Sequence, residues 1–192
     1  MLAESDHFLA LSFRGTKELK DVATDLDPTH SSFGRVRLHK GFLTRAEQAV
    51  SGRARIADML FARMQADATR RKTLLLTGHS LGGSAAICFA IRRLVLAAPN
   101  GRLPEFLART KVVTFAAPLC VNRESHPKLN RVLQRGGFPL GLNQIFVNYV
   151  NKSDPVPNST RQARYLLGRD RLGRCSLGVL LWSACVIAMC SS

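Results

Sequence analysis

The sequence lacks cysteine pairs at the spacing of a zinc site or of a redox motif. Its five cysteines lie at positions 88, 120, 175, 185 and 190, and three of them fall in the last 18 residues. A disulfide framework needs an even set of cysteines spread over a small domain, and a zinc site needs closely spaced ligand pairs. The pattern therefore excludes both classes, and we expect no metal.

Acidic residues are scarce in the second part of the chain. Residues 1–60 hold 9 basic and 8 acidic side chains, whereas residues 61–192 hold 19 and 5, for a formal net charge of +15 overall. A basic body attracts nucleic acid or anionic lipid. However, 21 of the 28 basic residues are scattered arginines with few aromatic residues between them, and no nucleic-acid-binding motif is visible. We therefore expect no nucleic-acid partner and interpret the charge as a solvated surface.

The sequence also shows neither a secretory signal nor an internal repeat. The segment Met1–Asp6 carries two acidic side chains and no apolar run, so we expect no signal peptide in this chain. The remaining composition is ordinary, with 46% hydrophobic and 21% charged residues. A chain of 192 residues is long enough to bury one core without disulfides or metals.

Short apolar runs alternate with segments of helical periodicity. We predict buried strands at residues 7–13, 73–77, 111–116 and 144–150. We predict helices at residues 44–67, 84–98 and 127–134, the first of them as one long amphipathic helix. Strands that are apolar throughout and alternate with helices indicate an α/β fold with a mostly parallel sheet and helices on both faces.

The segment Gly78–Gly82 reads Gly-His-Ser-Leu-Gly and lies between an apolar strand and an apolar helix. A GxSxG pattern in this setting is typical of a nucleophile elbow, a tight turn that lifts the serine hydroxyl above the edge of the sheet. Glycines flank the serine because a Cβ there would strike the neighbouring strand or helix. The pattern predicts Ser80 as a nucleophile and the amide of Leu81, at the helix N-terminus, as an oxyanion donor. A glycine-rich helix start without catalysis is the alternative.

Four short segments form a set that is more specific than the elbow alone. They are Phe13–Thr16 (FRGT), Leu38–Phe42 (LHKGF), Thr77–Gly83 (TGHSLGG) and Asn148–Pro157 (NYVNKSDPVP). In this order they resemble the motifs of the class 3 (fungal-type) lipases of the α/β-hydrolase superfamily. The resemblance spans about residues 7–158. It implies a partial lipase class 3-like domain over residues 1–160, with an α/β-hydrolase-type sheet and an incomplete core.

The resemblance also implies a role for individual residues. Ser80 would be the nucleophile and Asp154 the acid of the catalytic triad, in the chain order usual for these hydrolases. Thr16 and Leu81 would form the oxyanion hole. The implied activity is that of a serine carboxylester hydrolase that acts on acylglycerols or related lipid esters through an acyl-enzyme. No cofactor is implied.

No histidine follows Asp154, where the family has its catalytic base; the histidines lie at positions 7, 30, 39, 79 and 126. Without a base the serine hydroxyl is a weak nucleophile, and losing an essential triad member costs on the order of 10⁶ in turnover. His126 follows a strand that ends at the same sheet edge as Ser80, so it is the candidate for a substitute base. A solvated loop histidine is the alternative, and His39 and His79 are interpreted as structural. The alternative function is an inactive hydrolase-fold protein that binds lipid or a membrane surface.

Residues 161–192 form a tail that is first basic and then apolar. The 18 residues from Cys175 to Ser192 carry no charge. Three interpretations fit: a membrane anchor, which would associate the protein with a membrane, a helix packed on the hydrolase core, or a segment foreign to the native domain. The missing histidine and a buried strand that begins at residue 7 agree with the third. We therefore expect the chain to be truncated or divergent at both ends.

Overall fold

The computed structural model of the chain describes residues 1–15, 30–33, 36–51, 56–66, 71–97, 108–137 and 141–151. Its strands are β1 (Leu2–Glu4), β2 (Phe8–Phe13), β3 (His30–Phe33), β4 (Val36–His39), β5 (Thr73–His79), β6 (Thr110–Phe115) and β7 (Phe146–Tyr149). Its helices are α2 (Lys40–Ser51), α3 (Ile56–Gln65), α4 (Leu81–Ala97), α6 (His126–Arg135) and α7 (Leu142–Ile145), with a 3-10 turn η3 (Arg123–Ser125).

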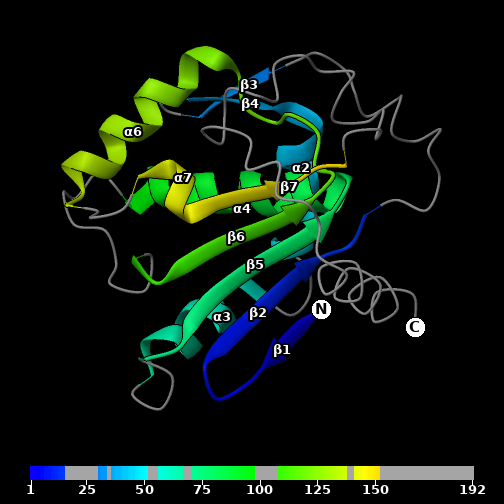
Figure 1. The fold of residues 1–192 in the computed structure, drawn as a ribbon, viewed down its shortest axis with the longest axis vertical. Helices are drawn as coiled ribbons and strands as arrows, with labels where there is room; N and C mark the ends of the chain where they lie inside the picture. Colours follow the sequence, from blue (N-terminus) through cyan, green and yellow to red (C-terminus); the bar gives the residue numbers. More distant parts are fainter. Residues whose placement is uncertain are drawn as a thin grey trace.

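Five strands form the main sheet, in the order β1-β2-β5-β6-β7 (Figure 1). Strand β1 runs antiparallel to β2, and every other neighbouring pair is parallel. The register aligns Phe13 with Gly78, His79 with Phe115, and Phe115 with Tyr149. The carboxyl ends of β2, β5, β6 and β7 therefore meet at one edge, and the predicted mostly parallel α/β sheet is confirmed.

Helix α4 is the centre of the helical layer, packing on the sheet and against α2 and α6. From β2 to β7 the strand order follows the chain order, and because β-α-β crossovers are right-handed, successive connecting helices fall on one face. Leu76 and Val112 on that face are fully buried, whereas Leu75 and Val113 on the opposite face are half-buried. A second helical layer, predicted for the opposite face, is not among the elements that the structure describes.

Two predicted elements have different bounds in the structure. The single helix predicted over residues 44–67 is wrong: two helices, α2 and α3, occupy the segment, and α2 begins earlier, at Lys40. Gly52, between them, disfavours a continuous helix by about 1 kcal/mol relative to alanine. The strand predicted from residue 144 begins at Phe146, because Leu142–Ile145 form the short helix α7.

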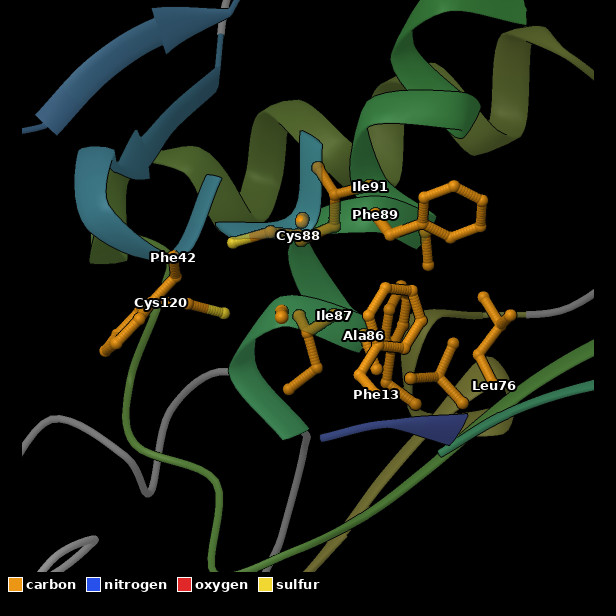
Figure 2. Packing of buried hydrophobic residues seen from close by; sticks show 14 of the residues in the cluster. Phe13, Phe42, Leu76, Ala86, Ile87, Cys88, Phe89, Ile91 and Cys120 are labelled. Carbon is orange, nitrogen blue, oxygen red and sulfur yellow. The ribbon is translucent and has the colours of Figure 1, made fainter. Parts of the chain in front are cut away.

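Figure 2 shows the buried cluster that surrounds α4. Phe13 of β2 packs against Phe89 of α4, with ring centroids 5.5 Å apart. The residues of α4 from Leu81 to Ile91 are all buried, so this helix is apolar around its whole circumference. Small residues such as Ala86 let the neighbouring elements approach the helix closely. The core therefore fixes the N-terminus of α4, where the GxSxG segment ends.

Two buried thiols, Cys88 of α4 and Cys120 after β6, lie together within this cluster (Figure 2). The hydroxyl of Ser84 donates to the carbonyl of Pro118 at 2.8 Å. Cys88 lies one helical turn beyond Ser84, and Cys120 lies two residues beyond Pro118. Because each of these steps covers about 6 Å along its segment, the hydrogen bond between Ser84 and Pro118 also brings the two thiols close to each other. The hydrogen bond with the Cys120 thiol, together with burial, raises the pKa of Cys88 well above its ordinary value.

Cys88 is expected to resist alkylation in the native protein. Thiolate is the reacting form, and the raised pKa keeps Cys88 protonated near pH 8, where an exposed cysteine is partly ionised. We expect iodoacetamide to modify Cys88 at least about tenfold more slowly in buffer than in guanidinium chloride. Peptide mass spectrometry of timed samples measures both rates, and equal rates would contradict the buried thiol pair.

Within the described ranges, no helix is long and apolar enough to cross a membrane. Residues 161–192, including the apolar segment 175–192, lie outside those ranges. The three interpretations of the tail therefore stay predictions, as does the boundary near residue 160.

Candidate active site

Ser80 occupies the one-residue turn between the last residue of β5, His79, and the first residue of α4, Leu81. Its φ angle is 52°, in the left-handed region that costs a residue with a side chain about 1–2 kcal/mol. The Ser80 N–H donates to the carbonyl of Phe115 at 2.8 Å, and the Ser80 carbonyl accepts from the N–H of Gly83 at 2.9 Å. The sharp bend is therefore held from both sides, as a nucleophile elbow requires.

Two glycines of the motif are required by close backbone packing. A Cβ on Gly82 would lie 2.2 Å from the carbonyl oxygen of Phe13 and 2.8 Å from the nitrogen of Gly15. A Cβ on Gly78 would lie 2.4 Å from the carbonyl carbon of Gly82. The end of β2, the end of β5 and the first turn of α4 thus touch through their backbones, which leaves no room for a side chain.

The two predicted oxyanion donors are Leu81 and Thr16. Leu81 is the first residue of α4 and its side chain is fully buried. Its N–H belongs to the first turn, where amides have no partner inside the helix, and its role as an oxyanion donor stays a prediction. Gly15 passes beside the elbow, since a Cβ on it would lie 2.9 Å from the carbonyl oxygen of His79. Thr16 follows Gly15 directly but lies outside the described residues, so its role stays a prediction.

No described contact joins the other two predicted catalytic residues to Ser80. Asp154 lies beyond the last described residue, Asn151, which follows β7. His126 begins α6 and is half-buried. Over the part of the chain that the structure describes, no hydrogen bond joins His126 to Ser80. Both roles stay predictions.

The remaining histidines near the motifs differ in their surroundings. His39 is buried and stacks on Phe42, with ring centroids 4.2 Å apart. The side chain of His79 is exposed at the end of β5. The interpretation of both residues as structural stays a prediction.

A second left-handed turn lies beside the elbow, and sequence reasoning missed it. Ala116 has a φ angle of 51° and follows β6, the strand next to β5. The side chain of Asn148, on β7, forms hydrogen bonds with the backbone of Ala117 in this turn. Asn148 opens the segment Asn148–Pro157, but no local pattern in the sequence shows its hydrogen-bond partners, because they lie about 30 residues earlier in the chain.

An apolar cavity of about 30 Å³ lies behind this turn, on the α4 side of the sheet. Its lining includes Ile87, Ile91, Leu129, Phe146 and Asn148. The volume is that of about two water molecules, so the cavity is too small for an acyl chain as it stands. Among the described side chains, no group of three His, Cys, Asp or Glu could hold a metal ion.

The chain matches one family model and is similar in fold to several solved lipase structures. A family model described as Lipase (class 3) matches residues 10–163. Lipase II from Rhizopus niveus is 23% identical with a TM-score of 0.57, over 83% of this chain and 53% of that chain. Lip2 lipase from Yarrowia lipolytica is 22% identical with a TM-score of 0.56, over 80% and 52% respectively. A lipase from Rhizopus microsporus var. chinensis is 21% identical with a TM-score of 0.56, over 81% and 48%.

The similarity to solved structures supports the fold of the chain. At such identities the similar structures show the fold, and this chain spans about half of their length. None of the curated proteins matches the chain.

Proposed function

Since the chain belongs to the class 3 lipase family, we propose that it is a serine carboxylester hydrolase that acts on acylglycerols or related lipid esters. One observation carries the proposal: Ser80 bends into the left-handed region between a central parallel strand and the N-terminus of a buried helix. Such a bend is costly for serine and is the geometry that a nucleophile elbow needs.

The proposed reaction proceeds through an acyl-enzyme. The Ser80 hydroxyl oxygen attacks the acyl carbonyl, and its proton passes to an imidazole base, which then protonates the leaving alcohol. The developing oxyanion accepts hydrogen bonds from Leu81 and Thr16, and one donor of this kind is worth about 10²–10³ in kcat. Asp154 would orient the imidazole, and water would then release the acid.

The proposal is tested by labelling the chain with a fluorophosphonate and by measuring fatty-acid release from acylglycerols. We expect one modified peptide, with the adduct on Ser80, and hydrolysis that the probe abolishes. Labelling that maps to another serine would overturn the assignment. A chain that neither labels nor hydrolyses esters, although folded by circular dichroism, would overturn the proposed activity.

The base is identified by a separate substitution. If His126 supplies it, His126→Ala lowers the rate of labelling by several orders of magnitude, whereas the exposed His7→Ala leaves the rate unchanged. Both rates are measured by probe fluorescence in gels at matched times. Unchanged labelling in His126→Ala would exclude this residue as the base.

A second candidate function rests on the missing histidine and on the basic charge. A hydrolase fold without a base would bind lipid or a membrane surface through its net charge of +15. This alternative predicts binding to anionic vesicles that weakens as salt is raised, together with no labelling of Ser80.

A further inference from the structure

The two left-handed turns of the active-site edge are structurally joined. Ser80 and Ala116 are the non-glycine residues with positive φ in the described part of the chain. Each directly follows a strand end, and those ends, His79 and Phe115, are register partners. The Ser80 N–H donates to the Phe115 carbonyl. The backbone that enters the Ala116 turn is therefore hydrogen-bonded to the elbow.

The side chain of Asn148 binds both backbone groups of a single residue in this turn. Its Oδ1 accepts from the N–H of Ala117 at 3.2 Å, and its Nδ2 donates to the carbonyl of Ala117 at 3.0 Å. Because an N–H only donates and a carbonyl only accepts, these two bonds fix which end of the amide is which. The hydroxyl of Thr114 adds a third bond, to Oδ1, at 3.0 Å.

The same turn is in contact with the first turns of the nucleophile helix. A Cβ on Gly83 would lie 2.7 Å from the Cβ of Ala117, so the two residues are in close contact. The Ser84 hydroxyl donates to the carbonyl of Pro118, and the N–H of Ala116 donates to the carbonyl of Tyr149. The turn is thus held between α4 on one side and β7 on the other.

A strained turn of this kind persists only where its surroundings hold it. Without the amide of Asn148, the N–H and carbonyl of Ala117 would lose their partners, and the left-handed conformation at Ala116 would lose part of its support. Movement there would reach Ser80 through the Phe115 carbonyl. We propose that Asn148 is a positioning residue, whose side chain holds the turn of residues 116–118 against the elbow and so fixes the presentation of Ser80. Its effect on ester hydrolysis rests on the proposed function.

Amide hydrogen exchange tests this inference without any need for hydrolysis, so that its failure is separate from failure of the proposed activity. In Asn148→Ala we expect exchange at the amides of Ala117 and Ser80 to accelerate about tenfold to a hundredfold, with exchange at Leu76 in β5 unchanged. The Ser80 amide is the decisive one, because it does not bond to Asn148. Where esters are hydrolysed, kcat falls and KM stays within about twofold.

Two further variants keep the test decisive. Asn148→Asp has nearly the same shape and retains the acceptor, but it lacks the donor to the Ala117 carbonyl, so it is used if the alanine variant fails to fold. Asn143→Ala, at an exposed position on α7, is the matched control and should exchange like the wild type. Faster exchange at Ala117 with unchanged exchange at Ser80 would mean that Asn148 stabilises only the turn of residues 116–118 and does not affect the elbow. Equal acceleration of Ala117, Ser80 and Leu76 would mean a general loss of stability, and either result would overturn the proposal.

Discussion

Ser80→Ala is expected to abolish fluorophosphonate labelling and, where an imidazole serves as the base, to lower ester hydrolysis on the order of 10⁶-fold. The reason is chemical, since no oxygen remains at the bend to attack an acyl carbonyl. The fold should survive, because the hydrogen bonds at Ser80 come from its backbone and alanine has a similar size. We expect the free energy of unfolding to change by about 1 kcal/mol or less, measured by urea denaturation.

The matched control for this variant is Ser32→Ala, which removes an exposed hydroxyl from β3. It should label and hydrolyse esters at the rate of the wild-type chain. Labelling of Ser80→Ala at the wild-type rate would show that the probe reacts elsewhere, and the interpretation of the elbow as a catalytic turn would then fail. Residual hydrolysis equal to that of the wild type would lead to the same result.

Gly82→Ala is expected to destabilise the protein by about 3 kcal/mol or more, the upper range for overpacking. The new methyl group would lie 2.2 Å from the carbonyl oxygen of Phe13, and its nearest neighbours are backbone atoms that cannot rotate away. The end of β2 and the start of α4 would have to separate, which would also displace Leu81 from the elbow. Urea denaturation measures the loss of stability, and probe labelling measures the loss of reactivity at Ser80.

Gly141→Ala is the control for this substitution. Gly141 has a φ angle of −72°, which alanine adopts readily, and the atom nearest its Cβ is the end of the flexible Asn143 side chain. We expect its stability to stay within about 1 kcal/mol of the wild type. If Gly82→Ala were equally mild, the close approach of β2 and α4 would not be a feature of the protein in solution.

Much of the fold could be predicted because its signals are local. Apolar runs such as the one at residues 73–77 identify buried strands, and their alternation with helices is enough to predict a parallel sheet. The bounds of elements were harder to predict. The helical periodicity of residues 44–67 continues across Gly52, so the pattern did not show that two helices, α2 and α3, share the segment. The same limit applies to α7, whose last two residues, Gln144 and Ile145, were predicted as the start of a strand.

In the candidate site, too, the locally encoded part was predictable from the sequence and the rest was not. The elbow at Ser80 was predictable because glycine, serine and the change from strand to helix all lie within a few consecutive residues. The predicted partners Thr16 and Asp154 came from resemblance to a family and lie outside the described residues. His126 was chosen by its place after a strand, and its relation to Ser80 stays a prediction.

By itself, the sequence determined the four parallel strands of the main sheet, the glycine-flanked serine between β5 and α4, and the family to which the chain belongs. Only the tertiary structure decided that a second left-handed turn, at Ala116, lies against the elbow and that Asn148 holds it. The physical reason is that an elbow is encoded by the conformational limits of adjacent residues. The hydrogen bonds of Asn148 instead join positions 31 residues apart, which only the pairing of β6 with β7 brings together.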